Sequence, residues 1–214
     1  SMLFGLQTAF RSAAGSLAGD YLRLYPSRFA QGLEGLRING LVWMGNFEEM
    51  QRRMDAKLDA GFGSVKLKIG AIDFDSELAL LRRLRGRYSA ADVELRVDAN
   101  GAFSPAEAPA RLEALARFSL HSIEQPIKQG QWEEMAALCR TSPLPIALDE
   151  EMIGVHETAE KQRLLDTIRP HYLVLKPSLH GAFTGCAEWM ALARERGIGY
   201  WLSLINIRRR RRRG

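Results

Sequence analysis

The sequence predicts an α/β protein built as a (β/α) TIM-type barrel, of which about seven strands can be counted along the chain. Short apolar runs ending in a charged residue alternate with segments of helical periodicity. Five consecutive runs end at Lys68, Asp98, Glu124, Asp149 and Lys176, which are 30, 26, 25 and 27 residues apart. A strand, a helix and two loops need about that length. An open doubly wound sheet has a single crevice, whereas all strand ends of a barrel meet at one mouth, so the pattern favours the barrel.

The first elements follow from local patterns. Residues 3–20 carry apolar side chains at helical spacing and predict one helix, and residues 35–44 predict a first strand. Asn46 is a favourable cap for a helix over residues 47–60, which Gly61 ends.

The later helices each lie between two of the charged strand ends. They are expected at residues 75–87, 104–118, 131–140, 156–168 and 182–196. Pro105 takes a permitted first-turn position in the second of these helices. Residues 198–205 predict the last strand, so seven strands alternate with six intervening helices. A barrel closes with eight strands, and the eighth would fall where the arginines near the end of the chain stand.

The composition is that of one ordinary globular domain, with 214 residues, 46% of them hydrophobic and 26% charged. No apolar run approaches the roughly 18–20 residues that span a bilayer, and the first residues lack the pattern of a signal peptide. Two cysteines are too few for a disulfide framework. We therefore expect a cytoplasmic protein without membrane contact, and a homo-oligomer is compatible with the sequence.

Six consecutive arginines, Arg208 to Arg213, dominate the net charge. Subtracting these six charges from the net +5 leaves −1, so the rest of the chain is nearly neutral. A basic run can bind nucleic acid or an anionic membrane. Nothing basic surrounds this run, so we interpret it as an artefactual or disordered tail, and nucleic-acid binding is expected only through it.

Two lysines lie close together on one predicted strand. Lys66 and Lys68 are two residues apart, so their side chains share a face, while Val65, Leu67 and Ile69 point to the other face, toward the helices. The lysines would then enter the barrel interior near its mouth. Adjacent ammonium groups repel, which lowers the pKa of at least one and creates a base that works near neutral pH. Taken alone, such a pair is more often a pair of solvated surface lysines.

Three carboxylates follow on the next three strands. Asp98, Glu124 and Asp149 would place anionic oxygens side by side, which suits a hard divalent cation, Mg²⁺ first and Mn²⁺ as the alternative. Asn100 and Glu150 flank this set and are candidates to orient the ligands. For Glu150, the role of a helix cap is equally compatible with the sequence.

Lys176 ends the strand on the side of the barrel opposite Lys68, and Pro177 favours an extended conformation for it. We expect Lys176 to act either as a second acid/base or as a cation that stabilises an anionic intermediate. Three carboxylates between two lysines are the composition of a metal-assisted proton-transfer site.

The order of these motifs resembles the enolase superfamily, in its muconate-lactonizing-type branch. The motifs are Lys-x-Lys at 66–68, Asp-x-Asn at 98–100, Glu-Gln-Pro at 124–126, Asp-Glu at 149–150 and Lys-Pro at 176–177. Within that branch, residues 39–45, 177–181 and 199–203 look most like the o-succinylbenzoate synthase family.

This resemblance implies a Mg²⁺-dependent dehydratase of menaquinone biosynthesis, which converts 2-succinyl-6-hydroxy-2,4-cyclohexadiene-1-carboxylate to o-succinylbenzoate. The metal held by the three carboxylates would bind the substrate carboxylate and stabilise an enediolate. Lys68 would remove the α-proton and return it to the departing hydroxyl, Lys66 would tune Lys68, and Lys176 would stabilise the intermediate.

The resemblance also implies a division of the chain into parts. Residues 1–30 would be the remnant of a capping domain, 31–207 a partial barrel and 208–214 the arginine tail. With the cap and the eighth strand incomplete, we expect poor activity from the chain alone. The alternatives are an N-succinylamino acid racemase, a dipeptide epimerase or a muconate-type cycloisomerase with Lys68 and Lys176 as opposed bases. A non-catalytic alternative is a polyanion-binding module that acts through the tail.

Overall fold

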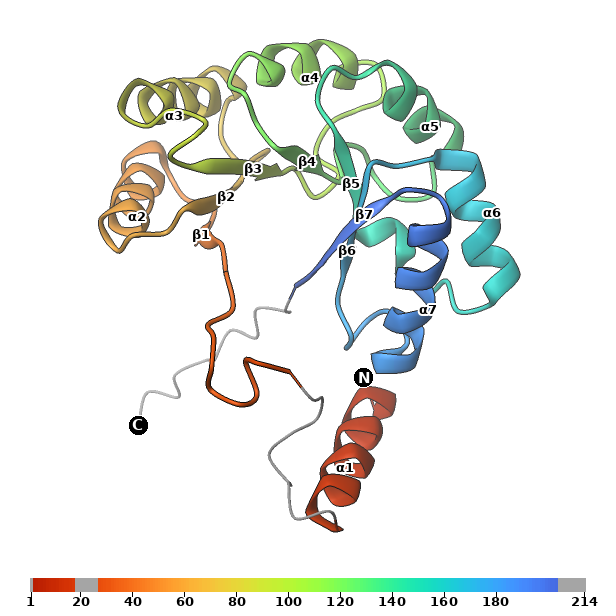
Figure 1. Cartoon of the computed structure of the whole chain (residues 1–214). Coiled ribbons are helices and arrows are strands. Elements are labelled where there is room, and N and C mark those ends of the chain that lie inside the picture. The colour runs from red at the N-terminus through yellow and green to blue at the C-terminus, as the bar shows by residue number, and fades with distance from the viewer. Residues whose placement is uncertain (1, 18–26, 204–214) are drawn as a thin grey trace, which may run out of the picture.

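The computed structural model describes residues 2–17 and 27–203, and within them seven parallel strands form one curved sheet in sequence order (Figure 1). The strands are β1 (Gly40–Val42), β2 (Ser64–Lys68), β3 (Glu94–Asp98), β4 (Ser122–Glu124), β5 (Ile146–Leu148), β6 (Tyr172–Leu175) and β7 (Gly199–Leu202). The sheet is an open half-barrel, since no strand of the described residues joins β7 back to β1. The predicted barrel of seven strands is confirmed.

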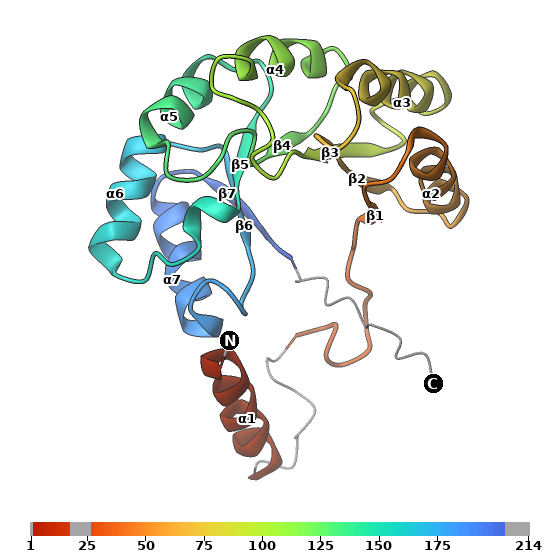
Figure 2. The ribbon, with the colours of Figure 1, turned by 180° about the vertical axis from the view of Figure 1, so that it is seen from behind.

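Helices cover the outer side of the curved sheet, as the view from behind shows (Figure 2). They are α2 (Phe47–Asp59), α3 (Phe74–Arg87), α4 (Ala108–Ala116), α5 (Trp132–Thr141), α6 (Thr158–Ile168) and α7 (Ala182–Glu195), with a 3₁₀ turn η1 (Glu150–Met152) after β5. The alternation of seven strands with six helices is therefore as predicted. Among the described residues, no helix combines the length and the apolar character needed to cross a bilayer.

Alternation along β2 separates the core from the barrel interior. Val65, Leu67 and Ile69 are at most 1% exposed and belong to the apolar core between the sheet and the helices. Lys66 and Lys68 keep 12% of their side-chain surface exposed, on the opposite face. The predicted orientation of this strand is confirmed, because residues two apart on a strand share a face.

The start of α2 is built as the sequence predicts. The Asn46 side chain accepts a hydrogen bond from the Glu49 backbone N–H at 2.9 Å, and the Glu49 carboxylate accepts one from the Asn46 N–H at 3.4 Å. This reciprocal pair is a capping box that satisfies two backbone donors. Gly61 follows the helix with a positive φ of 80°, which glycine adopts without steric cost.

Two predicted boundaries were wrong. The first strand is shorter than residues 35–44, because only Gly40–Val42 pair with β2, and no described strand pairs with residues 35–39 or 43–44. The helix expected at 104–118 begins only at Ala108, because Ser104 and Glu107 bond each other through side chain and backbone and form a separate turn. The predicted helix residues 18–20 and strand residues 204–205 lie outside the described part of the chain.

Helix α1 (Met2–Leu17) lies against α7, at the end of the half-barrel (Figure 1). The Gln7 amide donates to Thr184 Oγ1 at 2.8 Å, and the rings of Phe4 and Phe183 are 5.2 Å apart. None of the residues of α1 is buried. The assignment of residues 1–30 to a capping domain stays a prediction.

Candidate active site

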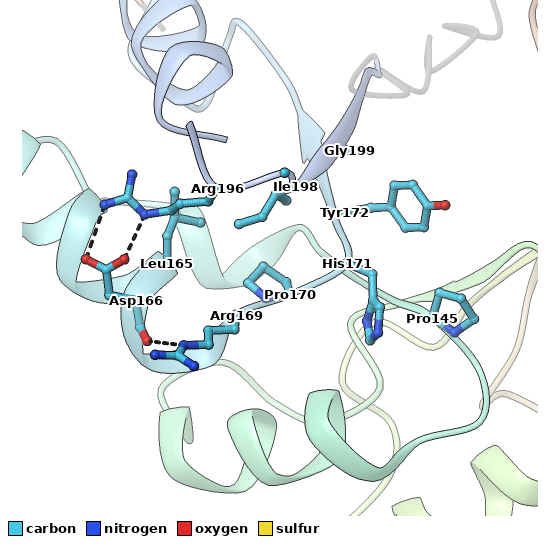
Figure 3. A pocket seen from close by; sticks show the side chains of 11 residues that line it. Pro145, Leu165, Asp166, Arg169, Pro170, His171, Tyr172, Arg196, Ile198 and Gly199 are labelled. Atoms are coloured by element: carbon cyan, nitrogen blue, oxygen red, sulfur yellow. Dashed lines mark hydrogen bonds and ion pairs between the residues drawn. The ribbon is translucent and has the colours of Figure 1, made fainter. Parts of the chain in front are cut away.

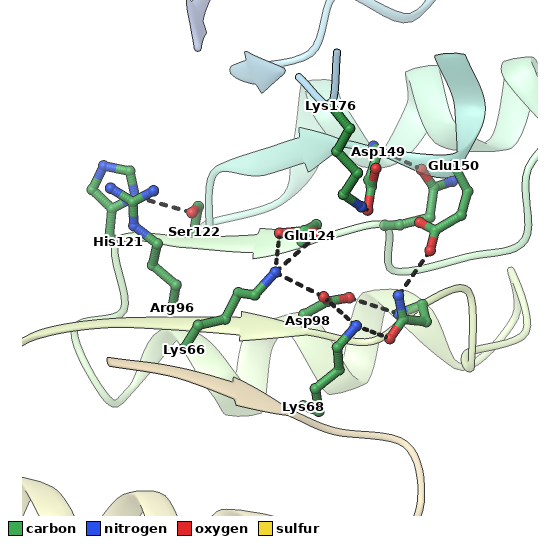
Figure 4. Close-up of polar contacts among 12 residues, drawn as sticks. Lys66, Lys68, Arg96, Asp98, His121, Ser122, Glu124, Asp149, Glu150 and Lys176 are labelled. Carbon is green, nitrogen blue, oxygen red and sulfur yellow. Dashed lines mark hydrogen bonds and ion pairs between the residues drawn. The ribbon is translucent and has the colours of Figure 1, made fainter. Parts of the chain in front are cut away.

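The charged residues at the strand ends meet at one edge of the sheet, as predicted (Figure 4). Parallel pairing sets Lys68 opposite Asp98 and Asp98 opposite Glu124 on three adjacent strands. Asp149 comes directly after β5, and Lys176 directly after β6. In-register parallel pairing is therefore what brings residues 25 to 30 positions apart into one cluster.

Lys66 and Lys68 share the carboxylate of Asp98. Asp98 Oδ2 lies 3.0 Å from Lys66 Nζ and 2.7 Å from Lys68 Nζ. Lys66 also reaches both oxygens of Glu124, at 2.9 and 3.1 Å. One ammonium group thus stands between two buried carboxylates, with a second ammonium beside it.

Asn100 and Glu150 join this cluster at its rim. Asn100 Oδ1 accepts a hydrogen bond from Lys68 Nζ at 2.5 Å, and Asn100 Nδ2 donates to Glu150 Oε1 at 2.8 Å. The Asn100 backbone N–H donates to Asp98 Oδ1 at 3.1 Å. Its φ of 45° is left-handed, a conformation that asparagine tolerates better than most residues. Asn100 therefore orients both Lys68 and Asp98.

On the far side of the cluster, Lys176 forms an ion pair with Asp149 Oδ2. The second oxygen of Asp149 is buried without a hydrogen-bond partner, as is Glu150 Oε2. A buried carboxylate oxygen without a partner is costly, so both oxygens fit a site that receives a cation.

The electrostatics of the carboxylates follow from burial and crowding. Burial raises the pKa of Glu124 to about 8, with the nearby carboxylates of Asp98 and Asp149 adding to the rise and the Lys66 ammonium opposing it. Burial also raises the pKa of Asp98, but Lys66 and Lys68 outweigh it, and its pKa lies below the usual value. Glu124 thus resists ionisation, whereas the neighbouring Asp98 ionises easily.

The lowered lysine pKa expected from Lys-Lys repulsion is not found at Lys66. Burial does lower the pKa of Lys66, but contact with Glu124 and Asp98 outweighs it and raises the pKa above the usual value. Lys66 is therefore a permanent cation. The prediction of a lowered pKa named at least one of the two lysines, and Lys66 is not that one, because the register places two carboxylates against its ammonium group.

The donor set fits a hard divalent cation in its chemistry. Within the described residues, however, no three His, Cys, Asp or Glu side chains are placed so that they could hold a metal ion together. Ammonium groups stand against Asp98, Glu124 and Asp149 instead. The unpartnered oxygen of Asp149 and the raised pKa of Glu124 show that the lysines do not fully neutralise the carboxylates.

Gln125 is a site residue that sequence reasoning did not single out. It is fully buried, and its Oε1 accepts hydrogen bonds from the backbone N–H groups of Asp149 and Glu151, at 3.2 and 3.3 Å. Its Nε2 donates to the Glu151 carboxylate at 3.0 Å. Gln125 thereby fixes the turn that carries Asp149. Its place next to Glu124 was the available signal.

Two of the cavities in the described part of the chain lie away from this cluster and exceed 600 Å³. One, of about 630 Å³, is lined by Pro145, His171, Gly199 and the Asp166–Arg196 ion pair, at the amino ends of β5, β6 and β7 (Figure 3). The second, of about 910 Å³, is lined by residues that include Ser64 and Glu94, at the amino ends of β2 and β3. The ionised groups that can move protons converge at the carboxyl ends, where barrel enzymes carry their active sites.

Above pH 8, where Glu124 is ionised as well as Asp98, replacing Lys66 by methionine is expected to destabilise the metal-free protein by roughly 3–5 kcal/mol, because the two carboxylates lose the cation that they share. Urea unfolding in the presence of a chelator measures this loss. Added Mg²⁺ should reduce the difference from the unmodified protein, because a cation bound by the same carboxylates replaces the lost charge. Lys128→Met, at an exposed lysine, is the control. Equal unfolding midpoints for Lys66→Met and the unmodified protein would contradict the expectation.

Together, the half-barrel and its cluster of lysines and carboxylates define a class of protein, and comparison with known families agrees. The family described as Enolase C-terminal domain-like matches residues 49–208, and the chain belongs to this family. The predicted superfamily membership is confirmed.

Individual relatives show which enzymes of this family the chain resembles. The chain is 55% identical over 187 residues to an o-succinylbenzoate synthase from Desulfotalea psychrophila, which covers 87% of this chain and 50% of that protein. The crystal structure of MenC from the same species has a TM-score of 0.79 at 42% identity, covering 95% of this chain and 67% of that one. An N-succinylamino acid racemase from Amycolatopsis sp. is 31% identical over 185 residues, which covers 84% of this chain and 48% of that protein. The chain thus spans about half the length of these curated relatives.

Proposed function

We propose that the chain carries the proton-transfer site of a Mg²⁺-dependent o-succinylbenzoate synthase, a lyase that removes water from its carboxylate substrate. The observation that carries the proposal is the cluster of Lys68, Asp98, Glu124, Asp149 and Lys176 at one mouth, in a chain 55% identical to a protein of that name. Enolase-superfamily sites use a lysine or histidine base together with Mg²⁺. Menaquinone biosynthesis and a cytoplasmic location are parts of the same proposal.

Asp98, Glu124 and Asp149 are the residues that would hold Mg²⁺, with Mn²⁺ as a possible substitute. When bound, the ion supplies positive charge for the anion that forms as the substrate loses its α-proton. The unpartnered Oδ1 of Asp149 could accept the cation while Lys176 stays on Oδ2. Asn100 and Gln125 keep Asp98 and Asp149 in position meanwhile.

Lys68 is the proposed base. Its Nζ takes the α-proton, and the electron pair of the broken C–H bond moves into the substrate carboxylate as an enediolate. The C–O bond to the hydroxyl group then breaks, Lys68 returns the proton to the departing oxygen, and one water molecule leaves. Asn100 Oδ1 orients Nζ for both transfers. The same group thus acts first as base and then as acid.

Lys66 and Lys176 supply fixed charge on the two sides of the cluster. Lys66 stays protonated because Glu124 and Asp98 raise its pKa, so it supplies charge and does not accept the proton. Lys176 pairs with Asp149, opposite Lys68, where its ammonium can face the anionic intermediate. This assigns stabilisation to Lys176 and proton transfer to Lys68.

The second candidate is a racemase or epimerase on the same scaffold. It is favoured by two lysines on opposite sides of the cluster, at Asp98 and at Asp149, and by the 31% identity to an N-succinylamino acid racemase. Such an enzyme exchanges the substrate α-proton with solvent deuterium from both enantiomers. A one-base dehydratase does not need Lys176 as a base.

The test is a chimera in which the matched residues of this chain replace the aligned half of the Desulfotalea psychrophila enzyme. We expect the chimera to dehydrate the cyclohexadiene carboxylate in the presence of Mg²⁺ and to lose activity in a chelator. The unmodified enzyme is the control for assay and folding. A folded chimera that racemises N-succinylamino acids but does not dehydrate would overturn the proposal in favour of the second candidate.

Binding of polyanions through Arg208 to Arg213 is the remaining alternative, and these residues lie outside the described part of the chain. Steep salt dependence of nucleic-acid binding that is lost on deleting residues 208–213 would support it. Absent or salt-independent binding would remove it. Assembly into a homo-oligomer is an expectation that neither proposal requires.

A further inference from the structure

A buried histidine beside the active site has no role in the proton transfer described above. His180 lies in the turn between β6 and α7, four residues after Lys176, and is 1% exposed. From the sequence alone, a surface or packing role is the more frequent one for such a residue. Its contacts assign it a different one.

His180 forms hydrogen bonds with both the N–H and the carbonyl of the Lys176 backbone. The Lys176 N–H donates to His180 Nδ1 at 3.0 Å, and the His180 N–H donates to the Lys176 carbonyl at 2.9 Å. The Lys176 carbonyl also accepts from the Leu179 N–H at 2.8 Å, so it is the bond from the Lys176 N–H, at the point where β6 has ended, that depends on the His180 ring. Burial lowers the pKa of His180 to about 4, so the ring is neutral at pH 7 and keeps the lone pair that accepts this bond.

Helix α7 packs closely against the turn that contains His180. A Cβ at Gly185 would lie 2.3 Å from the His180 carbonyl oxygen, so only glycine lets the helix approach so closely. Gly181 has a positive φ of 80° and lets the chain turn from His180 into the helix. The His180 backbone is thus fixed between the helix and the strand end.

We propose that His180 is a positioning residue for Lys176: its ring and backbone clamp the lysine backbone so that the ammonium group rests on Asp149. The contribution of this clamp to turnover rests on the proposed function. The clamp itself rests only on the hydrogen bonds and the close approach of α7, and it can be tested without activity.

The test compares two substitutions that differ in the acceptor they keep. In His180→Asn, the amide oxygen lies near the position of the lost Nδ1. In His180→Gln, the longer side chain carries its amide group past that point, to the position of Nε2. Two readouts follow Lys176 itself: hydrogen exchange of its backbone amide, and acylation of its amine relative to that of Lys57, both by mass spectrometry.

We expect His180→Gln to accelerate amide exchange and relative acylation at Lys176 by about tenfold, because the local opening no longer breaks a hydrogen bond. His180→Asn should stay within about twofold of the unmodified protein, since it retains the acceptor. A general loss of stability would instead raise the reactivity of all lysines together. Equal behaviour of the Asn and Gln variants, or no change at Lys176 in either, would overturn the proposal.

Gly185→Ala is the second variant, in case His180→Gln does not fold. It keeps the His180 ring but pushes against the His180 carbonyl, and it should also raise exchange and acylation at Lys176. A folded Gly185→Ala protein with unchanged Lys176 would contradict the clamp.

Turnover in the chimera separates the two proposals. His180→Gln is expected to lower kcat about tenfold or more with little change in KM, because misplacement of a catalytic group by about 1 Å is costly. If the chimera is inactive but exchange and acylation follow the expectation, the proposed function fails and the clamp stands. If the chimera is active and Lys176 is unaffected by His180→Gln, the clamp fails and the proposed function stands.

Discussion

Replacing Lys68 by alanine is expected to lower kcat for dehydration by about 10³-fold in the chimera, within the range of 10²–10⁴ that general acid–base catalysis contributes. Lys68 is the lysine that contacts both Asp98 and Asn100, at the end of β2, where its Nζ is oriented without being enclosed between two carboxylates. Initial-rate kinetics with excess Mg²⁺ measure the loss. Lys66 lies on the same side of the cluster but stays protonated because Glu124 and Asp98 raise its pKa, so we expect little residual activity.

Mg²⁺ binding should survive this substitution, because Lys68 supplies no ligand oxygen. Isothermal titration of Lys68→Ala with Mg²⁺ should therefore give an affinity close to that of the unmodified protein. Lys57→Ala is the matched control, since Lys57 lies in the last turn of α2, at the opposite end of the strands. Turnover retained by a Mg²⁺-binding Lys68→Ala variant would show that the base has been assigned to the wrong residue.

The same variant distinguishes the dehydratase from the racemase. In a racemase with two bases, Lys68→Ala blocks deuterium exchange from one enantiomer and Lys176→Ala blocks it from the other. In the proposed dehydratase, Lys68→Ala slows α-proton removal by the same factor as turnover. Exchange that persists from one enantiomer after Lys68→Ala would favour the racemase.

Replacing Glu124 by glutamine should give the second largest effect among these substitutions, which is a loss of Mg²⁺ affinity. Burial and the carboxylates of Asp98 and Asp149 raise the pKa of Glu124 to about 8, so at pH 7 most of the metal-free protein carries a proton there. Mg²⁺ needs the carboxylate form, so binding below pH 8 releases this proton. The apparent affinity should rise with pH up to about 8 and then level off.

Glu124→Gln cannot provide the carboxylate or release the proton. We expect its Mg²⁺ affinity to fall by about 100-fold or more and the pH dependence of binding to flatten. Calorimetry in buffers of different ionisation enthalpy measures both quantities, and Glu133→Gln at an exposed position of α5 is the control. Unchanged affinity in Glu124→Gln would remove Glu124 from the ligand set.

The raised pKa of Glu124 also sets the pH dependence of stability without metal. Glu124 ionises near its ordinary value of 4.5 in the unfolded chain but only near 8 in the folded one. Between these values the folded state binds more protons, so its stability contribution declines as the pH rises from about 4.5 to 8. Urea unfolding in a chelator at pH 5 and pH 8 should show this decline in the unmodified protein and a smaller one in Glu124→Gln. The opposite slope in the difference between the two proteins would contradict the raised pKa.

The parts of the fold that the sequence predicted correctly depend on local or regular patterns. Alternation along β2 placed Val65 and Leu67 in the core and Lys66 on the other face, because residues two apart on a strand share a side. The capping box at Asn46 is a contact within one helical turn, so its residue types reveal it. The start of α4 was misjudged because the bonds between Ser104 and Glu107 fit a separate turn as well as a helix start.

The sequence predicted which charged residues form the site, but not which of them are in contact. Constant spacing of charged strand ends brought Lys68, Asp98 and Glu124 to one mouth, since parallel pairing repeats the same geometry from strand to strand. The raised pKa of Lys66 could not be predicted from the sequence because it depends on which carboxylates lie within reach of the ammonium group. Gln125 was missed, and the backbone contact of His180 was not predicted, because both residues act on the backbone of other site residues, which no spacing in the sequence reveals.

The sequence by itself therefore determined the class of fold, the strands and helices, and the charged residues that share one end of the sheet. It could do so because side chains repeat at fixed intervals along strands and helices, and parallel pairing repeats the same geometry from one strand to the next. Only the tertiary structure decided that Lys66 lies between Asp98 and Glu124, that Glu124 resists ionisation, and that His180 clamps Lys176. These properties depend on distances of a few ångströms and on burial, which arise when strands, turns and helices pack together.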